Sequence, residues 1–274
     1  MKVFIGYDVR EDVAAKVCAY SIRRHTRSNV DIRFLNHVEL RREGLFRRPW
    51  LTEAESGNRI DLVDGKPFST EFSHSRFLIP HLCGYKGWAL FMDCDMIFTS
   101  DLTKLFDLVD DRYAVMVVKH QHKPLEKEKM DGQPQTRYHR KNWSSFMLIN
   151  CGHPANRSLT PGYVNMASGT DMHAFKWLGD EVASEALIGE LPRTYNWIDG
   201  SSPIMPPPAK PGQKAVLPDM IHYTVGGPWF PNYRTVKYGD VWVEYYERWQ
   251  AEGNYAGLPT AVPTTRYETK FTKS

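Results

Sequence analysis

Trp88 to Phe98, read as WALFMDCDMIF, decides the fold of this chain, because a short apolar run leads directly into two aspartates. Short apolar runs are typical of buried strands, and open α/β sheets bind ligands beyond the carboxyl ends of their strands. Asp93 and Asp95 therefore stand where we expect the chemistry of such a sheet. Residues i and i+2 of an extended chain point the same way, so both carboxylates can approach one cation.

Two carboxylates this close suit a divalent cation with oxygen ligands. Mg2+ and Mn2+ prefer such ligands and usually share their coordination sphere with substrate phosphates. The sequence Asp93-Cys94-Asp95 therefore indicates a site for a metal ion and a diphosphate. The same pattern also arises by chance and often only caps a turn, so the surrounding sequence has to discriminate between the two interpretations.

The first segment, MKVFIGYD, has the pattern of an apolar strand that ends at Tyr7 and Asp8. Apolar residues then recur at helical spacing from Val13 to Ile22, and a strand, loop and helix in this order begin a nucleotide-binding half. The loop lacks G-x-G-x-x-G, so we expect no dinucleotide site of that type. Asp8 would instead hydrogen-bond a base or ribose, unless it merely ends the strand.

Strand and helix patterns continue to alternate along the chain. The expected strands are Asp31–Leu35, Tyr113–Val118 and Asn142–Ile149. Helices are expected over Phe72–Leu82, where Pro80 predicts a kink or an early end, over a segment capped by Ser100, and from Asp240 onward. This alternation predicts an α/β fold with a mainly parallel central sheet flanked by helices.

Four segments together carry a family resemblance: KVFIGYD, HSRFLIPHL at 74 to 82, FMDCD, and IHYTVGGPWF at 221 to 230. They resemble family 8 of the retaining glycosyltransferases, which includes bacterial lipopolysaccharide galactosyltransferases and glycogenin, and they occur in the same order. The resemblance implies a GT-A fold and a nucleotide-sugar donor, usually UDP-linked. It also implies that a hexose moves to a saccharide or another hydroxyl acceptor.

The resemblance also assigns residues by position. Asp93, Asp95 and His222 match the ligands of an Mn2+ ion, with Mg2+ as the alternative, and Arg76 matches an arginine that contacts the donor sugar and the aspartates. The donor-binding residues expected from the resemblance are Ile5, Tyr7, Asp8, Arg76, Asp93, Cys94, Asp95, Ser144, Ser145, Gly226 and Gly227. Ser144 and Ser145 replace an Asn-Ala-Gly turn of the family, which leaves the donor sugar open.

Asp180 and Glu181 match an acidic residue and a glutamine that lie beside the anomeric carbon in the family. A glutamate there could shield developing oxocarbenium charge or act as a nucleophile, so Asp180, Glu181 and Arg76 are the candidate catalytic residues. The alternative is local, because Asp180 can cap a helix and Glu181 can favour its positive end.

His222 follows a strand-like segment and precedes Gly226 and Gly227, whose backbone N–H groups could form a nest for phosphates. The alternative is a core histidine beside a glycine-proline turn. The lysine that the family usually carries shortly after the glycine is missing, and Lys237 is only a distant candidate.

Length and composition agree with one soluble enzyme. The 274 residues contain 42% hydrophobic and 24% charged residues, which allows one domain over residues 1 to 254 and a loosely ordered tail over 255 to 274. The net charge of +3 makes no case for nucleic-acid binding. The cysteines lack C-x-x-C spacing, which predicts buried, reduced thiols and a cytoplasmic protein; they are Cys18, Cys83, Cys94 and Cys151.

Several segments admit two interpretations. No run is long enough to span a bilayer, but RREGLFRRPW at 41 to 50 is either a solvated basic loop or a peripheral membrane contact. Residues 119 to 141 are expected to form a polar loop. Its end, RYHRK, is either a solvated surface segment or a basic site that attracts an anionic acceptor. Residues 203 to 211 are rich in proline and read as an extended excursion. The aromatic residues of the last helix, Trp242, Tyr245 and Trp249, pack in a core or stack on sugars.

Two other functions compete with glycosyl transfer. A nucleotidyltransferase shares a similar sheet and metal site but normally carries a glycine-rich basic loop near its first strand, and GYDVRED offers neither feature. A sugar- or nucleotide-binding protein without activity could use most of the same contacts. Turnover of a nucleotide sugar separates the three.

Overall fold

The structure is a computed structural model, and it describes residues 1–120, 128–129, 133–134, 140–200, 202 and 216–252. The proline-rich excursion at 203 to 211 and the predicted tail at 255 to 274 lie outside the described residues, as does most of the polar loop at 119 to 141.

A six-stranded sheet forms the centre of the molecule, in the order β12-β8-β11-β6-β1-β2. The strands are β1 (Lys2–Gly6), β2 (Asp31–Leu35), β6 (Trp88–Met92), β8 (Val115–Val117), β11 (Phe146–Asn150) and β12 (Ile188–Glu190). Only β11 runs against its neighbours β6 and β8, while the remaining pairs are parallel. The predicted mainly parallel sheet is therefore confirmed. Its central strands are apolar because both faces are covered.

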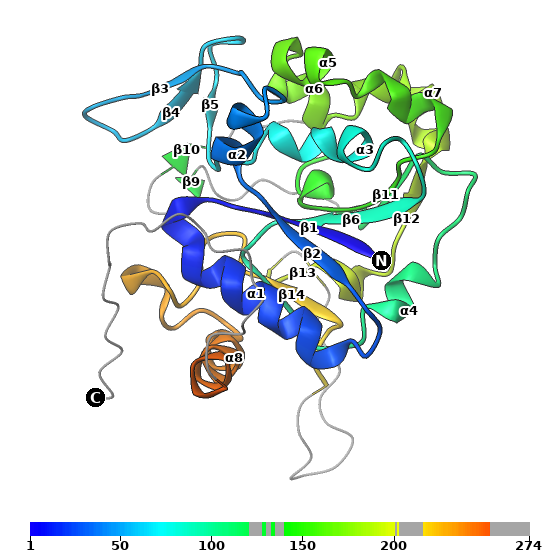
Figure 1. Ribbon diagram of the computed structural model, residues 1–274. Coiled ribbons are helices and arrows are strands. Elements are labelled where there is room, and N and C mark those ends of the chain that lie inside the picture. Colours follow the sequence, from blue (N-terminus) through cyan, green and yellow to red (C-terminus); the bar gives the residue numbers. More distant parts are fainter. Residues whose placement is uncertain (121–127, 130–132, 135–139, 201, 203–215, 253–274) are drawn as a thin grey trace.

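Helices cover both faces of this sheet (Figure 1). On one side lie α1 (Asp12–His25), which follows a 3-10 turn at Val9–Glu11, and α8 (Gly239–Ala251). On the other side lie α3 (Ile79–Leu82), α5 (Pro161–Met166), α6 (Gly169–His173) and α7 (Glu181–Leu187). The short helices α2 (His37–Arg42) and α4 (Thr103–Phe106) flank the central strands.

A small second sheet brings a distant part of the chain to the end of β6. It has the order β13-β14-β7, with β13 (Trp197–Ile198), β14 (Met220–His222) and β7 (Met96–Phe98). β14 pairs antiparallel with β7, so that His222 stands opposite Met96. Helix α1 holds β7 in place, because the hydroxyl of Ser21 accepts the backbone N–H of Phe98 at 3.0 Å. This pairing places His222 beside the residues that follow β6.

An antiparallel hairpin unit, β3 (Trp50–Thr52), β4 (Arg59–Asp61) and β5 (Pro67–Phe68), stands beside the sheet. It accounts for part of the segment at residues 41 to 50. Arg48 is completely buried and makes a two-pronged ion pair with Asp61 at 2.7 and 2.8 Å, and Phe46 is buried in the core. Arg48 and Phe46 are therefore interior residues, held by a buried carboxylate and by the core, whereas Arg42 and Arg47 are exposed.

Several predicted element boundaries differ from the structure. The Phe72–Leu82 segment begins its helical turns at Ser75, and Pro80 lies in the first turn of α3, where a missing N–H costs nothing. Ser100 is not the cap of α4, because Asp101 accepts the backbone N–H of Thr103 at 2.9 Å. The strand expected from Asn142 begins at Phe146, after a 3-10 turn at Trp143–Ser145. A shorter strand, β8, stands where Tyr113–Val118 was predicted.

The aromatic residues of α8 pack in the interior, as the spacing favoured. Trp242 and Tyr245 are buried, and Trp242 stacks on Tyr246 with ring centroids 5.3 Å apart. Trp229 packs against Trp242 at 5.3 Å from a different part of the chain. These rings form a second hydrophobic core between α1, α8 and the small sheet, and they do not form a surface for sugars.

Strands β9 (Glu128–Lys129) and β10 (Gln133–Pro134) form an antiparallel pair. The four cysteines are all buried and free, as predicted. Among the described residues, no helix combines the length and apolar character that a membrane crossing requires.

Candidate active site

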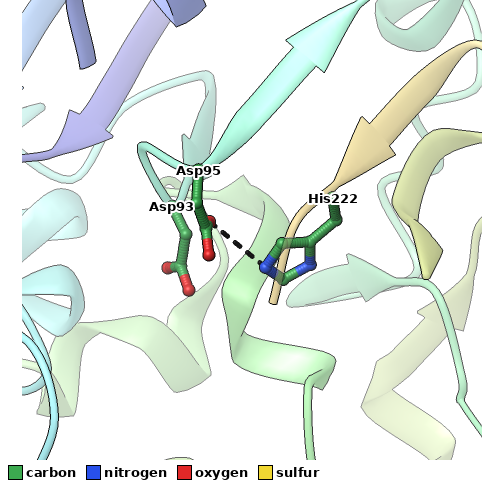
Figure 2. A group of neighbouring side chains, drawn as sticks. All are labelled: Asp93, Asp95 and His222. Carbon is green, nitrogen blue, oxygen red and sulfur yellow. Dashed lines mark ion pairs between the residues drawn. The ribbon is translucent and has the colours of Figure 1, made fainter. Parts of the chain in front are cut away.

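Asp93, Asp95 and His222 come together in one buried group. One ligand atom from each lies within 4.8 Å of the other two. Figure 2 shows the carboxylates and the imidazole turned toward the same space, with Oδ1 of Asp95 3.2 Å from Nε2 of His222. The chain bends between the end of β6 at Met92 and the start of β7 at Met96, and this bend presents both aspartates beyond the strand end.

The tautomer of His222 follows from its other ring nitrogen. Nδ1 lies 2.8 Å from Oδ1 of Asn196, and an amide oxygen can only accept, so Nδ1 carries the proton. The amide orientation is consistent, because Nδ2 of Asn196 donates to the hydroxyl of Ser145 at 3.1 Å. Nε2 faces the carboxylates, 3.2 Å from Oδ1 of Asp95, and in the tautomer with its single proton on Nδ1 it offers a lone pair. Two carboxylates and an imidazole in this tautomer are a donor set that fits a divalent cation.

Arg76, in the 3-10 helix Ser75–Leu78, contacts Asp93 of this group. Its Nη1 lies 2.9 Å from Oδ1 of Asp93 and donates to the carbonyl oxygen of Ser144 at 2.8 Å. The guanidinium stacks over the rings of Phe72 and Phe91 at 5.2 and 4.8 Å, which fixes its plane. Asp93 is held on its backbone side too, because its N–H donates to the carbonyl oxygen of Ser145 at 2.9 Å.

These side chains open onto a cavity with an empty volume of about 960 Å3, part of it open to solvent. Of the predicted residues, Asp93, Asp95, Arg76, Ser144 and Ser145 line it. Lys141, from the RYHRK segment considered for an anionic acceptor, also lines it. Further polar lining residues that the sequence patterns did not single out include Asp64, Lys66, His74, Thr170 and His173. They come from the hairpin unit, from the turn before the 3-10 helix at Ser75–Leu78, and from α6. No local signal marks these five, since only the tertiary fold brings their elements together.

His74 and the basic residues before Asn142 have environments that their sequence did not indicate. Burial, together with the positive charges of Arg48 and Arg76, lowers the pKa of His74 to about 3, so this histidine is neutral at neutral pH.

Arg140 and Lys141 are buried, and the guanidinium of Arg140 donates to the carbonyl oxygen of Ala174 at 3.0 Å. The expectation of a solvated surface is therefore wrong for these two residues, while residues 137 to 139 lie outside the described residues.

Asp180 and Glu181 do not reach the cavity. Both are exposed at the start of α7, and the carboxylate of Asp180 accepts the backbone N–H of Ala183 at 2.9 Å. This is the helix-capping arrangement that stood as the alternative interpretation. The carboxylate beside the anomeric carbon that the resemblance implied is thus not supplied by this pair in the described conformation.

Gly226 and Gly227 also lie outside the cavity lining, and packing accounts for both. A Cβ on Gly227 would stand 2.0 Å from the ring of Trp229, and one on Gly226 would stand 2.9 Å from the ring of Tyr233. Gly226 has φ of +123°, a backbone conformation that other residues rarely adopt. Lys237 pairs with Asp199 at 2.8 Å at the surface, so the distant candidate does not reach the cavity either.

Asp8 is completely buried inside a network of charges. Arg10 and Arg59 pair with its carboxylate at 2.9 and 3.0 Å, and the backbone N–H of Glu71 donates to it at 3.1 Å. Burial alone would raise the pKa of Asp8, but the hydrogen bond and charge of Arg10 and the charge of Arg59 hold it below its ordinary value. With its oxygens engaged in this way, Asp8 ties β1 to the hairpin unit and is not presented to a base.

The other predicted donor-binding residues lie in the interior. Ile5 is buried in the sheet, and the hydroxyl of Tyr7 donates to Asp12 at 2.9 Å. The thiol of Cys94 points away from the cavity and donates to Glu11 at 3.2 Å. Burial raises the pKa of Glu11 well above its ordinary value, and the negative charges of Asp95 and Asp8 add to this effect. Cys94 and Glu11 thus support the bend that carries the two aspartates.

The geometry agrees with what comparison of the sequence shows, since the profile of glycosyl transferase family 8 matches residues 13–230. The chain belongs to glycosyl transferase family 8. It is also similar to protein CDI of Arabidopsis thaliana, with 41% identity over 251 residues that cover 92% of this chain and 88% of that protein. The family that the four sequence segments resembled is therefore confirmed.

Solved structures similar to this chain are glycosyltransferases. GlyE of Streptococcus pneumoniae TIGR4 has a TM-score of 0.54 and 19% identity over 92% of this chain and 63% of its own. The galactosyltransferase LgtC, in complex with donor and acceptor sugar analogues, has a TM-score of 0.52 and 13% identity over 92% of this chain and its whole length. The bifunctional glycosyltransferase WbbM has a TM-score of 0.56 and 18% identity over 92% of this chain and 50% of its own.

These likenesses establish the fold of this family 8 protein. The chain spans half the length of WbbM and less than two thirds of GlyE, while it covers LgtC completely. The fold is GT-A, and the protein is a glycosyltransferase enzyme.

Proposed function

We propose that this protein is a metal-dependent retaining glycosyltransferase. It moves a hexose from a nucleotide sugar, in the first instance a UDP-sugar, to a saccharide or another hydroxyl acceptor. The observation that carries the proposal is the buried group of Asp93, Asp95 and His222, whose ligand atoms lie within 4.8 Å of one another, with both aspartates lining a cavity.

We infer that Mn2+ is the preferred ion and that Mg2+ is the alternative. Mg2+ favours oxygen ligands in an octahedral arrangement, whereas the imidazole of His222 supplies nitrogen to the set. Asp93 and Asp95 would supply the oxygen ligands, and Asn196 would hold the imidazole in the tautomer that presents Nε2. When bound, the cation would supply Lewis-acid stabilisation of the charge that develops on a leaving diphosphate.

The residues of the chain then position the reaction. Arg76 contacts Asp93 and the turn at Ser144, so it holds the metal ligands and the adjacent cavity wall in one arrangement. In the transfer, the bond between the sugar C1 and the diphosphate oxygen breaks and its electron pair goes to that oxygen. The acceptor hydroxyl bonds to C1 on the face that the diphosphate leaves, and the hydroxyl proton passes to the leaving oxygen.

A covalent intermediate on Asp180 or Glu181 is the competing route to retention. Both carboxylates are exposed and absent from the cavity lining, so a direct attack by the acceptor is the route that we favour. The roles of Asp180 and Glu181 as catalytic residues, and of Asp8 as a base contact, would require these segments to rearrange.

The test uses purified protein with UDP-, GDP- and ADP-sugars, each with Mn2+, with Mg2+ and with neither ion. We expect UDP-sugars and Mn2+ together to raise the melting temperature and to give slow release of free hexose. Proton NMR of the first-formed hexose should show the anomeric configuration of the donor. Asp95→Asn should abolish both effects without unfolding the protein, while Asp31→Asn, at an exposed position on β2, serves as the matched control.

Three outcomes contradict the proposal. Normal turnover by Asp95→Asn would remove the metal assignment. Release of pyrophosphate from a nucleoside triphosphate and a sugar 1-phosphate would instead identify a nucleotidyltransferase. Binding of nucleotide sugars without transfer or hydrolysis, under every metal condition, would identify a binding protein.

A further inference from the structure

His74 is a buried residue of the cavity wall to which neither the sequence patterns nor the family resemblance gave a role. It precedes the 3-10 helix Ser75–Leu78, lies two residues before Arg76, and has only 4% of its surface exposed. Even so, it lines the same cavity as Asp93 and Asp95. Neither of its ring nitrogens is hydrogen-bonded to a residue that the structure describes. A buried polar group normally has a hydrogen-bond partner, so these nitrogens are available to a ligand.

Packing fixes the place of the His74 ring. The ring lies edge-on against Phe68, with centroids 5.1 Å apart and an interplanar angle of 71°. It also approaches Gly169, where an added Cβ would stand 2.8 Å from Nε2. Gly169 is held in turn, because its backbone N–H donates to the carboxylate of Asp64 at 2.8 Å. Any other residue at position 169 would put a carbon against Nε2, so the glycine keeps this nitrogen uncovered on that side.

The charge state of His74 limits what it can recognise. Burial and the positive charges of Arg48 and Arg76 lower its pKa to about 3, so the ring is neutral at neutral pH. A neutral imidazole has one nitrogen that donates and one that accepts, and a sugar hydroxyl also donates and accepts. A diphosphate instead accepts and favours charged donors. The chemistry of His74 therefore matches a hydroxyl group better than the diphosphate.

His74 belongs to the hairpin end of the cavity, which we define as Lys66, Phe68, His74 and Thr170. Lys66 and Phe68 come from the hairpin unit and Thr170 from α6, and Nζ of Lys66 donates to the hydroxyl of Thr170 at 2.9 Å. An aromatic ring with a few fixed polar groups is typical of a pocket that binds a small polar ligand. If the diphosphate is held at the two aspartates, the transferred sugar and the acceptor are what remains to fill this end.

We propose that the hairpin end is a sugar subsite, in which His74 hydrogen-bonds a hydroxyl group of a pyranose that lies beside the ring of Phe68. The pyranose is the transferred hexose or the saccharide acceptor, which share this chemistry. The inference rests on the proposed function and names a residue of that site that contacts sugar. A buried group that hydrogen-bonds a hydroxyl rejects sugars that lack or misplace it, because the group is then left unpaired.

The experiment measures sugar binding separately from nucleotide binding. In one arm, titration calorimetry with saturating Mn2+ gives the affinities for UDP, UDP-glucose and UDP-galactose. In the other arm, glucose, galactose, lactose and cellobiose are titrated by NMR into protein saturated with UDP and Mn2+.

Both arms compare the wild type with two substitutions of the histidine. His74→Phe keeps an aromatic ring but removes both nitrogens, and His74→Gln keeps a group that donates and accepts. His153→Gln is the matched control, because His153 accepts the backbone N–H of Ala155 outside the cavity.

We expect His74→Phe to bind UDP as the wild type does and to bind a sugar ligand about tenfold more weakly, as the loss of one hydrogen bond predicts. His74→Gln should lie between the two, and His153→Gln should match the wild type. Gly169→Ala should weaken the same ligand, because its Cβ would crowd Nε2. A loss confined to the UDP-hexoses assigns the subsite to the transferred hexose, and a loss confined to the free saccharides assigns it to the acceptor.

The inference is overturned if His74→Phe binds every sugar ligand as tightly as the wild type, because His74 is then only a core residue. It is also overturned if His74→Phe weakens UDP as much as the UDP-hexoses, which would make His74 a structural support. Failure of the wild type to bind UDP with Mn2+ is a separate result that would sink the proposed function itself.

Discussion

Arg76 and Asp93 form a buried ion pair, with Nη1 of the arginine 2.9 Å from Oδ1 of the aspartate and both side chains almost inaccessible to solvent. The same Nη1 donates to the carbonyl oxygen of Ser144 at 2.8 Å. Arg76 thus joins a proposed metal ligand to the wall of the cavity. Its charge also offsets the carboxylates of Asp93 and Asp95, which lie close together in a buried place.

Arg76→Ala should therefore destabilise the metal-free protein by about 3 kcal/mol, because it leaves buried carboxylates without their cation. The rise in melting temperature on adding Mn2+ should be larger in this variant than in the wild type, since the ion would replace part of the missing charge. Thermal unfolding with and without Mn2+ measures both. Arg76→Lys keeps the charge but loses the planar guanidinium that lies over the rings of Phe72 and Phe91, and turnover should fall about tenfold. Unchanged stability and turnover in both variants would contradict this account.

Asn196 should act as a positioning residue for His222. It accepts the Nδ1 proton of the imidazole at 2.8 Å and donates to the hydroxyl of Ser145, whose carbonyl oxygen binds the N–H of Asp93. Asn196→Ala should weaken Mn2+ binding about 10- to 100-fold, as for other groups that orient metal ligands. Electron paramagnetic resonance of free Mn2+, at one pH, measures the affinity.

Two variants complete that test. Asn196→Asp keeps an acceptor for Nδ1 and should retain more Mn2+ affinity than the alanine variant. Asn156→Ala removes a buried asparagine that donates to Ala114 and Asn150, away from the cavity, and should lower stability without changing Mn2+ affinity. Equal Mn2+ affinity in the wild type and Asn196→Ala would show that Asn196 does not orient the ligand.

His74 should make stability depend on pH. Its pKa is about 3 in the folded protein and 6.5 in a free chain, so between these values the unfolded state binds more protons. The contribution of His74 to stability is thus complete above pH 6.5 and is lost as the pH falls toward 3, by up to ~1.4 kcal/mol per pH unit. His74→Gln should have a shallower loss between pH 7 and 5, measured by urea unfolding at each pH. Identical slopes would contradict the buried neutral state.

Gly227 should matter for packing before it matters for phosphate binding. Gly227→Ala places a methyl group 2.0 Å from the ring of Trp229, so we expect a loss of about 2 kcal/mol from overpacking. Gly162→Ala is the control, because Gly162 lies in α5 with no close neighbour for a Cβ and should be neutral. Urea unfolding and UDP titration distinguish the roles. Full stability with reduced UDP affinity would favour the phosphate nest.

The sequence predicted well wherever a signal is local and periodic. The apolar run of β6 and the aspartates that follow it are adjacent in the chain, so strand and site residues could be recognised together. The alternating α/β order and the core position of Trp242 and Tyr245 follow from side-chain spacing in the same way. The family resemblance was carried by such segments, and the family was confirmed.

The sequence left the interpretation open where one signal has two physical meanings. An acidic pair at the start of a helix suits both a cap and a catalytic site, and Asp180 proved to be a cap. A basic segment with aromatic residues suits both a surface and a membrane contact, yet Arg48 is buried and pairs with Asp61, the last residue of β4. For Arg48 the deciding partner comes from another element of the fold, whereas for Asp180 the partner is local and only the helix geometry shows that the carboxylate meets it.

The amino-acid sequence by itself was enough to predict the sheet, the family and the aspartate pair. The periodicity of apolar residues and the ends of strands are properties of short segments, so they can be read locally. Only the tertiary structure decided which remote group meets that pair: His222, through the pairing of β14 with β7. Contacts between residues so far apart in the chain depend on how whole elements pack, and no local pattern encodes them.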